Sequence, residues 1–292
     1  MSRSLLDLSG KIDTLTIELF EIIKNTADTQ DIKFFVVGAS ARDMILEYGY
    51  KIKTKRATMD IDLGVQVADW GQYEKLKQGL IDTTNFEQDR QEQRLKFKNI
   101  LLVDIIPFGE IAEPEHNYTW QSEDGNEMST LGFSESFEDA ILVRLRNSPV
   151  LEVKLTSLAG LAIMKIIAWN DNPARGRDAK DLSLIIHNYL YAGNEERIFD
   201  EENDIFDKIK KDQGDYHKNA GARLLGRDIA KIALPESKKK IIEILKEETK
   251  DEGRYKLVEE MIDSYYKSGH DFEDNIELLQ QIKFGIFDIQ KS

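Results

Sequence analysis

The sequence predicts an α+β protein, with a mixed β-sheet and flanking helices over residues 1–150 and an all-helical domain over residues 151–292. Two observations lead to this prediction. Short apolar runs rich in β-branched residues alternate with helical patterns in the first half. From Ser157 onward, nearly every segment has apolar residues at helical spacing. The change of pattern places the domain boundary near residue 150.

The first segments alternate between helix and strand. Apolar residues near one helical face predict a helix over residues 4–26. The run IKFFVVG predicts a buried strand over residues 32–38, and residues 40–50 return to helical spacing. A basic loop over residues 51–58 leads to a strand over residues 59–67, in which side chains alternate.

The rest of the first half is expected to add one helix and several strands. Residues 69–83 have helical spacing, and residues 94–97 and 100–107 are predicted to pair through a turn at Lys98-Asn99. The other expected features are a polar loop or edge region over 109–127, strands over 127–133 and 139–146, a turn at 147–149, and a strand over 150–153 that pairs back.

Helical spacing dominates the second half. A helix begins after Ser157, whose hydroxyl is a suitable N-cap. Further helices are predicted over residues 177–191, 195–211, 217–232, 236–248, 251–267 and 273–283.

Composition limits the possible classes of protein. The net charge of −14 disfavours non-specific binding to nucleic acid or anionic membranes, although a local basic groove remains possible. Cysteine is absent, so neither disulfides nor thiolate chemistry are expected. The sequence shows no secretory signal and no apolar run of about 18 residues. A soluble cytoplasmic protein that does not bind membranes is therefore expected.

Two carboxylates share one face of the strand predicted over residues 59–67. Asp60 and Asp62 are two residues apart and point the same way, while Ile61 and Leu63 point into the core. Adjacent carboxylates repel unless a cation lies between them. Mg²⁺ is the usual ion where phosphates are handled. The alternative is an edge strand with a solvated acidic face.

A third carboxylate, Asp104, lies inside the apolar strand Leu101–Ile106, where an unpaired charge is costly. It is either a third metal ligand on a strand adjacent to the first pair, or an Asp satisfied by a neighbouring Arg or by backbone. Three carboxylates are able to hold two metal ions, one at the acceptor oxygen and one at the triphosphate.

Candidate phosphate contacts lie at the turn that follows the first predicted strand. Backbone amides and the Ser40 hydroxyl would cradle a phosphate there, and Gly38 and Arg42 belong to the same segment. Such turns also serve close packing alone. Arg56, just before the acidic strand, would offset triphosphate charge or is an ordinary loop arginine.

Together these motifs resemble the DNA polymerase β-like nucleotidyltransferase superfamily. The shared pattern is a Gly-small turn after a first strand, an Arg-x-Thr-x-Asp-x-Asp strand, and a lone Asp on a later strand. The resemblance implies that Gly38 and Ser40 hold the triphosphate and that Asp60, Asp62 and Asp104 hold Mg²⁺. Two departures are the Gly-Ala-Ser form of the turn and the long interval between Ser40 and Asp60.

Within that superfamily, the chain resembles the AbiEii/AbiGii-type toxin nucleotidyltransferases of bacterial type IV toxin–antitoxin systems. Leu161–Lys165 and the Arg177-Asp178-x-x-Asp181 motif carry this resemblance. It implies that Lys165 contacts the nucleotide phosphates, that Asp178 lines the same site as a base or positioning group, and that Asp181 supports the helix. From the residues alone, the alternatives are that Lys165 extends along apolar surface to water, and that Asp178 and Asp181 are carboxylates favoured by the dipole at a helix start.

The expected reaction is in-line attack of an acceptor hydroxyl on the α-phosphate of a nucleoside triphosphate, with pyrophosphate leaving. Asp60 and Asp62 would hold both metals, and Asp104 would help to deprotonate the nucleophile. The toxin resemblance suggests RNA, such as the 3′ end of tRNA, or a protein hydroxyl as acceptor, and a cognate antitoxin as partner.

A local basic stretch offers some support for an RNA acceptor, although a solvated helical face is the simpler explanation. The residues are Lys218, Arg223, Arg227, Lys231 and Lys238–Lys240. Alternatives are a small cationic acceptor such as an aminoglycoside, and a non-catalytic nucleotide-binding scaffold. A metal-dependent phosphohydrolase is disfavoured because His116, His187, His217 and His270 are scattered along the sequence.

Overall fold

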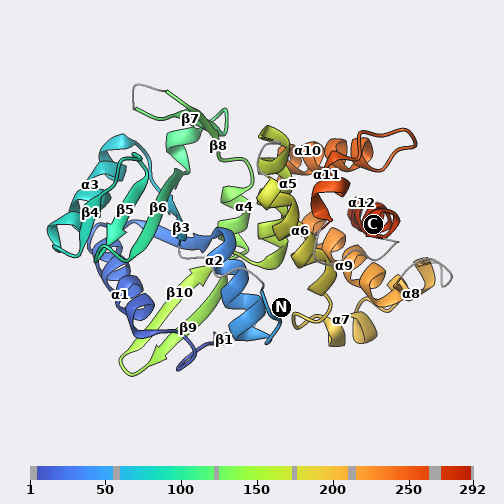
Figure 1. Cartoon of the computed structure of the whole chain (residues 1–292), viewed down its shortest axis with the longest axis horizontal. Helices are drawn as coiled ribbons and strands as arrows, with labels where there is room; N and C mark the ends of the chain where they lie inside the picture. Colours follow the sequence, from blue (N-terminus) through green and yellow to red (C-terminus); the bar gives the residue numbers. More distant parts are fainter. Residues whose placement is uncertain are drawn as a thin grey trace. The chain divides into compact units, whose positions relative to one another are not determined.

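A computed structural model of the chain describes residues 5–54, 60–121, 125–172, 176–209, 215–262 and 271–290. The chain divides into two compact units, Met1–Ser157 and Leu158–Ser292. The first contains a mixed β-sheet with helices and the second is helical in its described part, which confirms the predicted α+β class (Figure 1). The predicted boundary at residue 150 falls on the first residue of strand β10, which belongs to the sheet.

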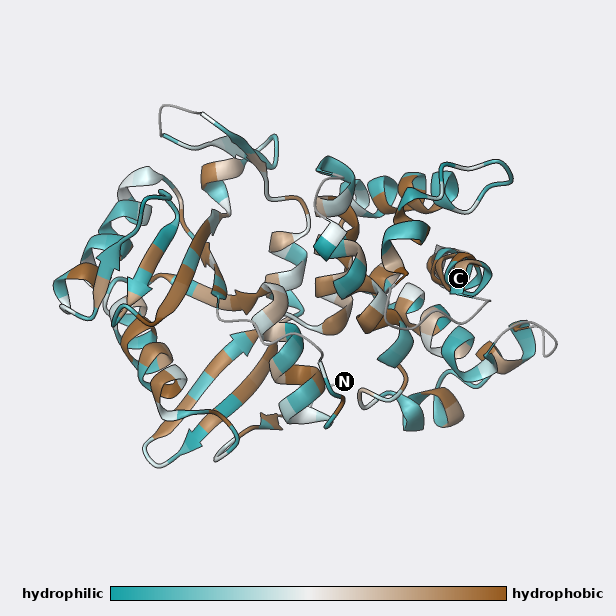
Figure 2. Ribbon diagram, in the orientation of Figure 1, coloured by the Kyte–Doolittle hydropathy of each residue, from teal (hydrophilic) through white to brown (hydrophobic). Residues whose placement is uncertain are grey.

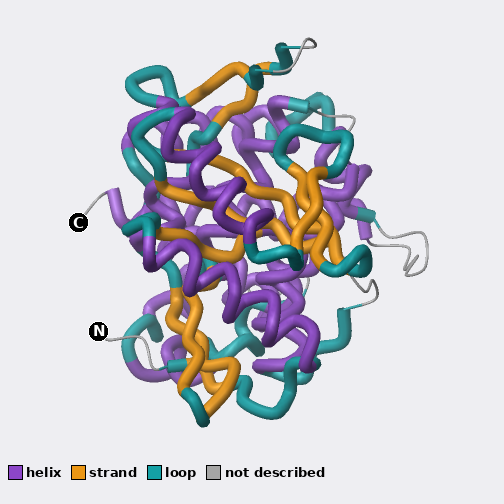
Figure 3. Tube along the Cα trace, turned by 90° about the vertical axis from the view of Figure 1, so that its left-hand side faces the viewer, coloured by secondary structure: helices purple, strands orange, loops and turns teal. Residues whose placement is uncertain are grey.

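Within the described residues of the first unit, one eight-stranded sheet has the order β1-β9-β10-β2-β3-β6-β5-β4. Its strands are β1 (Leu6–Asp7), β2 (Lys33–Val37), β3 (Asp60–Gln66), β4 (Phe86–Gln88), β5 (Arg94–Phe97), β6 (Leu101–Phe108), β9 (Ile141–Asn147) and β10 (Val150–Leu155). A separate hairpin of β7 (Asn117–Thr119) and β8 (Glu127–Ser129) stands at the top of Figure 3.

Alternating burial along the strands gives the sheet its two-sided character. Ile61 and Leu63 of β3 are buried, whereas the alternate residues Asp60 and Asp62 are half-buried on the other face. Burial also alternates along most of the β9–β10 hairpin, on which Figure 2 shows both apolar and polar stretches. The predicted orientation of the acidic strand is therefore confirmed.

The helices of the first unit connect these strands. They are α1 (Thr14–Thr29), α2 (Gly38–Asp43), which continues into a π-helix η1 (Met44–Gly49), α3 (Trp70–Asp82), a 3₁₀ turn η2 (Glu110–Ala112) and α4 (Phe133–Glu138). Helices α1 and α3 lie side by side along the sheet (Figure 1). Strands β3 and β6 are parallel neighbours, so the chain needs a crossover connection between them. The segment from α3 to β5 forms this connection.

The helix predicted over residues 4–26 begins later in the structure. Asp13 caps α1 by accepting a hydrogen bond from the Thr16 amide at 2.9 Å. Before this cap, Gly10 has a φ of 76°, which turns the chain. Leu6 and Asp7 instead form β1, which pairs in parallel with β9. The apolar residues at 5 and 8 therefore matched the helical pattern without being helical.

The strand predicted over residues 127–133 is also shorter than expected. Strand β8 ends at Ser129, and Phe133 opens helix α4. The rings of Phe133 and Phe137 meet those of Phe35 and Phe108 with centroids 5.4–6.4 Å apart. Burying two aromatic rings on the sheet favours a short helix over continued pairing.

The predicted β5–β6 hairpin is present, but its turn is longer by one residue. Lys98 and Asn99 both have positive φ angles, and the Ile100 amide donates to the Phe97 carbonyl at 2.9 Å. Phe97 pairs with Leu101, so Ile100 belongs to the turn. This register places Arg94 directly opposite Asp104.

The second unit contains helices throughout its described part. They are α5 (Leu158–Asp171), α6 (Gly176–Asn188), α7 (Glu195–Asp200), α8 (Asp204–Lys208), α9 (Tyr216–Ile232), α10 (Pro235–Glu248), α11 (Lys256–Met261) and α12 (Asp271–Gln290). In its described part, the helix predicted over 195–211 is broken into α7 and α8, and Glu202 and Asp204 near the break both accept hydrogen bonds from Arg227. The helix predicted over 251–267 is replaced, in its described part, by the shorter α11.

Helices α9 and α12 touch backbone to backbone. A Cβ atom on Gly226 would lie 2.1 Å from the Ile282 carbonyl oxygen, and one on Gly285 would lie 2.1 Å from the Arg223 carbonyl oxygen. Only glycine allows this approach at either position. None of the described helices is long and apolar enough to cross a membrane.

Candidate functional site

The three predicted acidic residues lie on neighbouring strands of the first unit. Strands β3 and β6 are parallel, and their register sets Asp62 beside Asp104 and Asp60 beside Leu102. Side chains at paired positions of adjacent strands share a face, so all three carboxylates lie on the same side of the sheet. The predicted adjacency of Asp104 to the first pair is confirmed, whereas its role as a metal ligand stays a prediction.

Gly38 brings the start of helix α2 against the Asp62 carboxylate. Val37, the last residue of β2, pairs with Asp62 across the sheet. Gly38 has a φ of 67°, and a Cβ atom there would lie 2.0 Å from Asp62 Oδ2. Glycine is thus required twice, for the left-handed backbone and for the space that the carboxylate occupies.

The remaining predicted phosphate contacts of this turn are engaged within the chain. The Ser40 hydroxyl donates to the Asp60 carbonyl oxygen at 3.3 Å, which ties α2 to the acidic strand. Arg42 is buried, and its Nε and Nη2 atoms both donate to Asp43 Oδ1, at 2.8 and 2.6 Å. Nucleotide contacts by Ser40 and Arg42 stay predictions. Arg56 and Thr58 lie outside the described residues.

Arg94 is part of this carboxylate cluster, although no sequence motif identifies it as a candidate site residue. Its Nε and Nη2 atoms donate to Asp104 Oδ1 and Oδ2, both at 2.7 Å, and Nη2 lies 3.9 Å from Asp60 Oδ2. These bonds raise the pKa of the guanidinium above its ordinary value, chiefly through Asp104. The open alternative for Asp104, an Asp satisfied by a neighbouring Arg, is what the structure shows.

The donor atoms of the cluster suit a hard divalent cation, because they are carboxylate oxygens on one face of two adjacent strands. Across the described ranges, however, no group of three or more His, Cys, Asp or Glu residues is arranged to hold a metal ion. Within the cluster, both oxygens of Asp104 accept hydrogen bonds from Arg94. Asp60 and Asp62 supply carboxylate oxygens on the same face of the sheet, the type of ligand that Mg²⁺ prefers.

In the second unit, Lys165 forms a buried ionic triad with both acidic residues of the Arg-Asp-x-x-Asp motif. Its Nζ atom lies 2.7 Å from Asp178 Oδ1 and 2.7 Å from Asp181 Oδ2. Burial lowers the pKa of the ammonium, but Asp181 and Asp178 outweigh burial and raise the pKa above its ordinary value. Lys165 therefore stays charged and does not extend to water, and Asp181 shares its role with Asp178.

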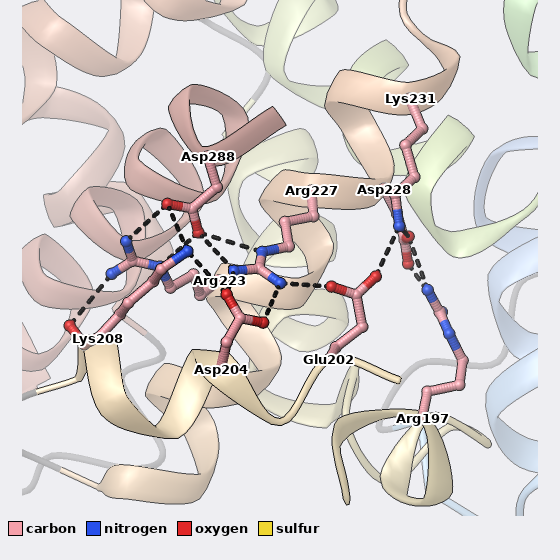
Figure 4. A network of polar contacts seen from close by, with 9 residues as sticks. All are labelled: Arg197, Glu202, Asp204, Lys208, Arg223, Arg227, Asp228, Lys231 and Asp288. Atoms are coloured by element: carbon pink, nitrogen blue, oxygen red, sulfur yellow. Dashed lines mark hydrogen bonds and ion pairs between the residues drawn. The ribbon is translucent and has the colours of Figure 1, made fainter. Parts of the chain in front are cut away.

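Arg223, Arg227 and Lys231 of the basic stretch considered for RNA binding form ion pairs inside the second unit (Figure 4). Arg223 and Arg227 are buried and donate to Asp288, and Arg227 also donates to Glu202 and Asp204. The other cations of the network are Arg197, Lys208 and Lys231, which pair with Asp228, Asp204, Asp288 and Glu202. The expectation of a basic RNA-binding face through Arg223 and Arg227 is wrong, and so is that of a solvated face, because both guanidinium groups are inside the unit.

This network sets the ionisation of its acids. Burial raises the pKa of Asp288, but the hydrogen bonds from Arg223 and Arg227 outweigh it and lower the pKa to about 2. Burial likewise raises the pKa of Asp228, and bonds from Arg197 and Tyr189 outweigh it, so that the net shift is downward. The acids are thus fully ionised at neutral pH and hold α7, α8, α9 and α12 together.

Comparisons with known proteins find distant structural similarities. No family model matches the sequence, and no curated protein matches it. The solution structure of the antibiotic-resistance factor ANT(2'')-Ia is 16% identical, covers 66% of this chain and 97% of its own, and has a TM-score of 0.35. A CCA-adding enzyme with ATP is 15% identical, covers 97% of this chain and 71% of its own, and has a TM-score of 0.33.

A STING-associated CdnE c-di-GMP synthase from Capnocytophaga granulosa is 12% identical, with coverage of 95% of this chain and 81% of its own and a TM-score of 0.28. All three TM-scores lie below 0.5, too low for the similarities to determine what this chain does.

Proposed function

We propose that this chain is a Mg²⁺-dependent nucleotidyltransferase of the DNA polymerase β-like superfamily, which moves a nucleoside monophosphate from an NTP to an acceptor hydroxyl. One observation carries the proposal. Asp62 lies beside Asp104 on parallel neighbouring strands, Asp60 shares their face, and the glycine turn that opens α2 rests against Asp62. Three clustered carboxylates beside a small-residue turn suit a metal–triphosphate complex better than they suit a structural sheet face.

Each residue of the cluster has a defined part in this proposal. Asp60 and Asp62 would bind Mg²⁺, which supplies Lewis-acid stabilisation of the triphosphate and of the acceptor oxygen. Gly38 leaves the space that fixes the Asp62 carboxylate, and Ser40 holds the turn to the strand through the Asp60 carbonyl. Backbone amides of the turn, rather than the buried Arg42, are the groups we expect to face phosphate.

The second unit contributes the toxin-like part of the proposal. The Lys165–Asp178–Asp181 triad matches the motif of AbiEii-type toxins, and its buried charge is kept by two carboxylates. We propose that Lys165 contacts nucleotide phosphate and that Asp178 positions it. A Lys165→Met variant should then bind NTP more weakly, while Lys239→Met, which removes an exposed lysine, should not.

The acceptor follows from the toxin resemblance alone. We propose an RNA, such as the 3′ end of tRNA, or a protein hydroxyl, and a cognate antitoxin that restrains the enzyme. Arg223 and Arg227 give no support to RNA, because both are committed to internal pairs.

The test is transfer of label from each α-³²P-labelled NTP, with Mg²⁺, to total bacterial RNA or to protein. The matched variants are Asp60→Asn/Asp62→Asn and Glu87→Gln, the latter on the exposed edge strand β4 of the same sheet. Label on RNA or protein with wild type and Glu87→Gln, but lost with the double variant, supports the proposal and names base and acceptor. Transfer that survives the double variant refutes it, and so does wild-type protein that neither transfers label nor binds NTP in a Mg²⁺-dependent way.

A further inference from the structure

Three aromatic rings form a row on helices α7, α8 and α9 of the second unit. The ring centroids of Phe199 and Phe206 are 5.4 Å apart, and those of Phe206 and Tyr216 are also 5.4 Å apart, with an interplanar angle of 19°. The Tyr216 hydroxyl donates to the Phe206 carbonyl oxygen at 3.0 Å, which fixes α8 against the start of α9. Because Phe206 and Tyr216 are half-buried, Phe199 is the open end of the row.

Phe199 is an exposed ring without a cation. Its exposed fraction of 59% is the largest of any phenylalanine in the described ranges. Phe284 of α12 is also exposed, but Arg223 and Lys283 lie 5.7 Å from its ring centroid. No cation of the described residues has such a position over Phe199. An ordered aromatic ring that faces water is typical of a binding anchor, because a partner covers it with little further cost of ordering.

Carboxylates without ion pairs lie beside this ring. Glu195 and Glu196 precede Phe199 on α7 by one helical turn, which makes them its neighbours on the helix surface, and Asp200 follows it. All three acids are exposed, and within the described part of the chain none has a cationic side chain within 4 Å. Asp200 also lies at the end of α7, where the helix dipole disfavours negative charge, so helix stability does not account for it.

The positive charges of α7 and α8 are already paired. Arg197 donates to Asp228 at 2.8 Å and Lys208 lies 2.8 Å from Asp204, and both side chains point into the ion-pair network (Figure 4). Residues 195–218 contain nine acidic and five basic residues, with those outside the described ranges included. The surface around Phe199 therefore has an excess of negative charge, which favours a cationic partner.

We propose that the row of Phe199, Phe206 and Tyr216, with the carboxylates of Glu196 and Asp200, docks a basic segment of a partner protein, whose Arg or Lys side chain lies over the open face of Phe199. The ring quadrupole attracts such a cation, and the carboxylates supply the counter-charge. Two successive separations of 5.4 Å make the row longer than one ammonium group covers, so a polypeptide with several side chains fits it better than a small amine. The surface lies within the second unit and does not depend on the proposed nucleotidyl transfer.

The test is fluorescence anisotropy of a labelled peptide of arginine and leucine residues, titrated with the full chain. Phe199→Ser should weaken binding at least about fivefold, because the aromatic face and its contact with the cation are lost. Phe284→Ser is the matched control, since it removes an exposed ring that already has two cations over it, and should change the affinity less than about twofold.

A second pair of variants tests the charges. Glu196→Gln/Asp200→Asn should weaken binding of the same peptide at least about threefold and reduce its dependence on salt concentration. Glu243→Gln/Glu259→Gln removes the same charge from exposed positions of α10 and α11 and should stay within about twofold of wild type. A peptide with glutamate in place of arginine should not bind.

Melting temperatures separate these effects from unfolding. Because Phe199 is 59% exposed, Phe199→Ser should melt within about 3 °C of wild type. Phe199→Leu keeps an apolar side chain without an aromatic face, and it should weaken binding even if the serine variant melts at a lower temperature.

Several results would overturn the proposal. Wild type that does not bind the arginine peptide, or equal weakening by Phe199→Ser and Phe284→Ser or by the two acid pairs, would leave only non-specific attraction. Displacement of the peptide by spermine at the same concentration of positive charge would mean that any polycation suffices. A dimer in sedimentation equilibrium that Phe199→Ser dissociates would make a second copy of this chain the occupant instead.

Discussion

Replacing Gly38 with alanine tests the coupling between the turn and the acidic strand. The new Cβ atom would lie 2.0 Å from Asp62 Oδ2, where ordinary contact begins at 3.4 Å. The carboxylate must therefore retreat by more than about 1 Å, a misplacement that costs roughly a hundredfold in a positioned reaction. The φ of 67° adds a strain of about 1–2 kcal/mol for a residue with a Cβ atom.

The assay combines urea unfolding with Mg²⁺-dependent binding of a fluorescent NTP analogue. Gly10→Ala is the matched control, since Gly10 has a φ of 76° but nothing within 4 Å of the new atom. Both variants should lose about 1–2 kcal/mol of unfolding free energy, and only Gly38→Ala should lose nucleotide binding. Equal loss of binding in the two variants, or none in Gly38→Ala, would refute the reasoning.

Three further predictions concern the second unit. Gly226→Ala places its Cβ atom 2.1 Å from a carbonyl of α12 and should cost about 3 kcal/mol of stability, while Gly176→Ala, with its nearest atom at 3.6 Å, should cost far less; denaturant midpoints compare them. Arg227→Met removes a buried guanidinium from Glu202 and Asp288, whose side chains are each 13% exposed, and should cost about 3 kcal/mol in urea unfolding. Lys239→Met, at an exposed lysine, should cost less than about 0.5 kcal/mol, and equal losses in the two variants would contradict the prediction. The pKa of Asp288 is lowered from 3.8 to about 2, so its ionised form contributes about 2 kcal/mol to the free energy of unfolding above pH 4. This contribution is lost as the pH falls toward 2, and the difference in unfolding free energy between wild type and Asp288→Asn should shrink over that range. A difference that stays constant with pH would contradict the prediction.

Alternation and strand order made much of the acidic cluster predictable. A period of two places Asp60 and Asp62 on one face, and an Asp inside an apolar strand marks Asp104 as an unusual position. The parallel pairing of β3 with β6 then brings the three together. The shared face of Asp60 and Asp62 and the unusual position of Asp104 both follow from the spacing of apolar and charged residues within single strands, which can be read from the sequence.

Arg94 was not predictable because its place depends on the length of one turn. A two-residue turn at Lys98-Asn99 would pair Arg94 with Val103 and direct the two side chains to the buried face. The observed turn includes Ile100, which shifts the register by one residue and turns Arg94 toward Asp104. A single residue of loop length thus decides whether the cluster contains a cation.

The prediction that Arg223 and Arg227 belong to an exposed basic face was wrong for a different reason. Arg223 and Arg227 are four residues apart, as an exposed basic face would have them, and their partner Asp288 lies more than sixty positions along the chain. Glu202 and Asp204 lie in the segment predicted as continuous helix, where no local signal marks them as partners of Arg227. Pairing across such distances is a tertiary property.

The close contact of α12 with α9 has a consequence for synthesis on the ribosome. The first unit has all its described strands once Leu155 has emerged, although its outermost strand β1 must wait for β9. The second unit needs α12, which supplies both Gly285 and Asp288 to α9. The two arginines of α9 therefore remain without Asp288 until residue 288 has been translated, whereas the sheet with its acidic cluster is free to form earlier. Slowed translation through residues 271–290 would prolong the exposure of this unpaired helix to chaperones and proteases.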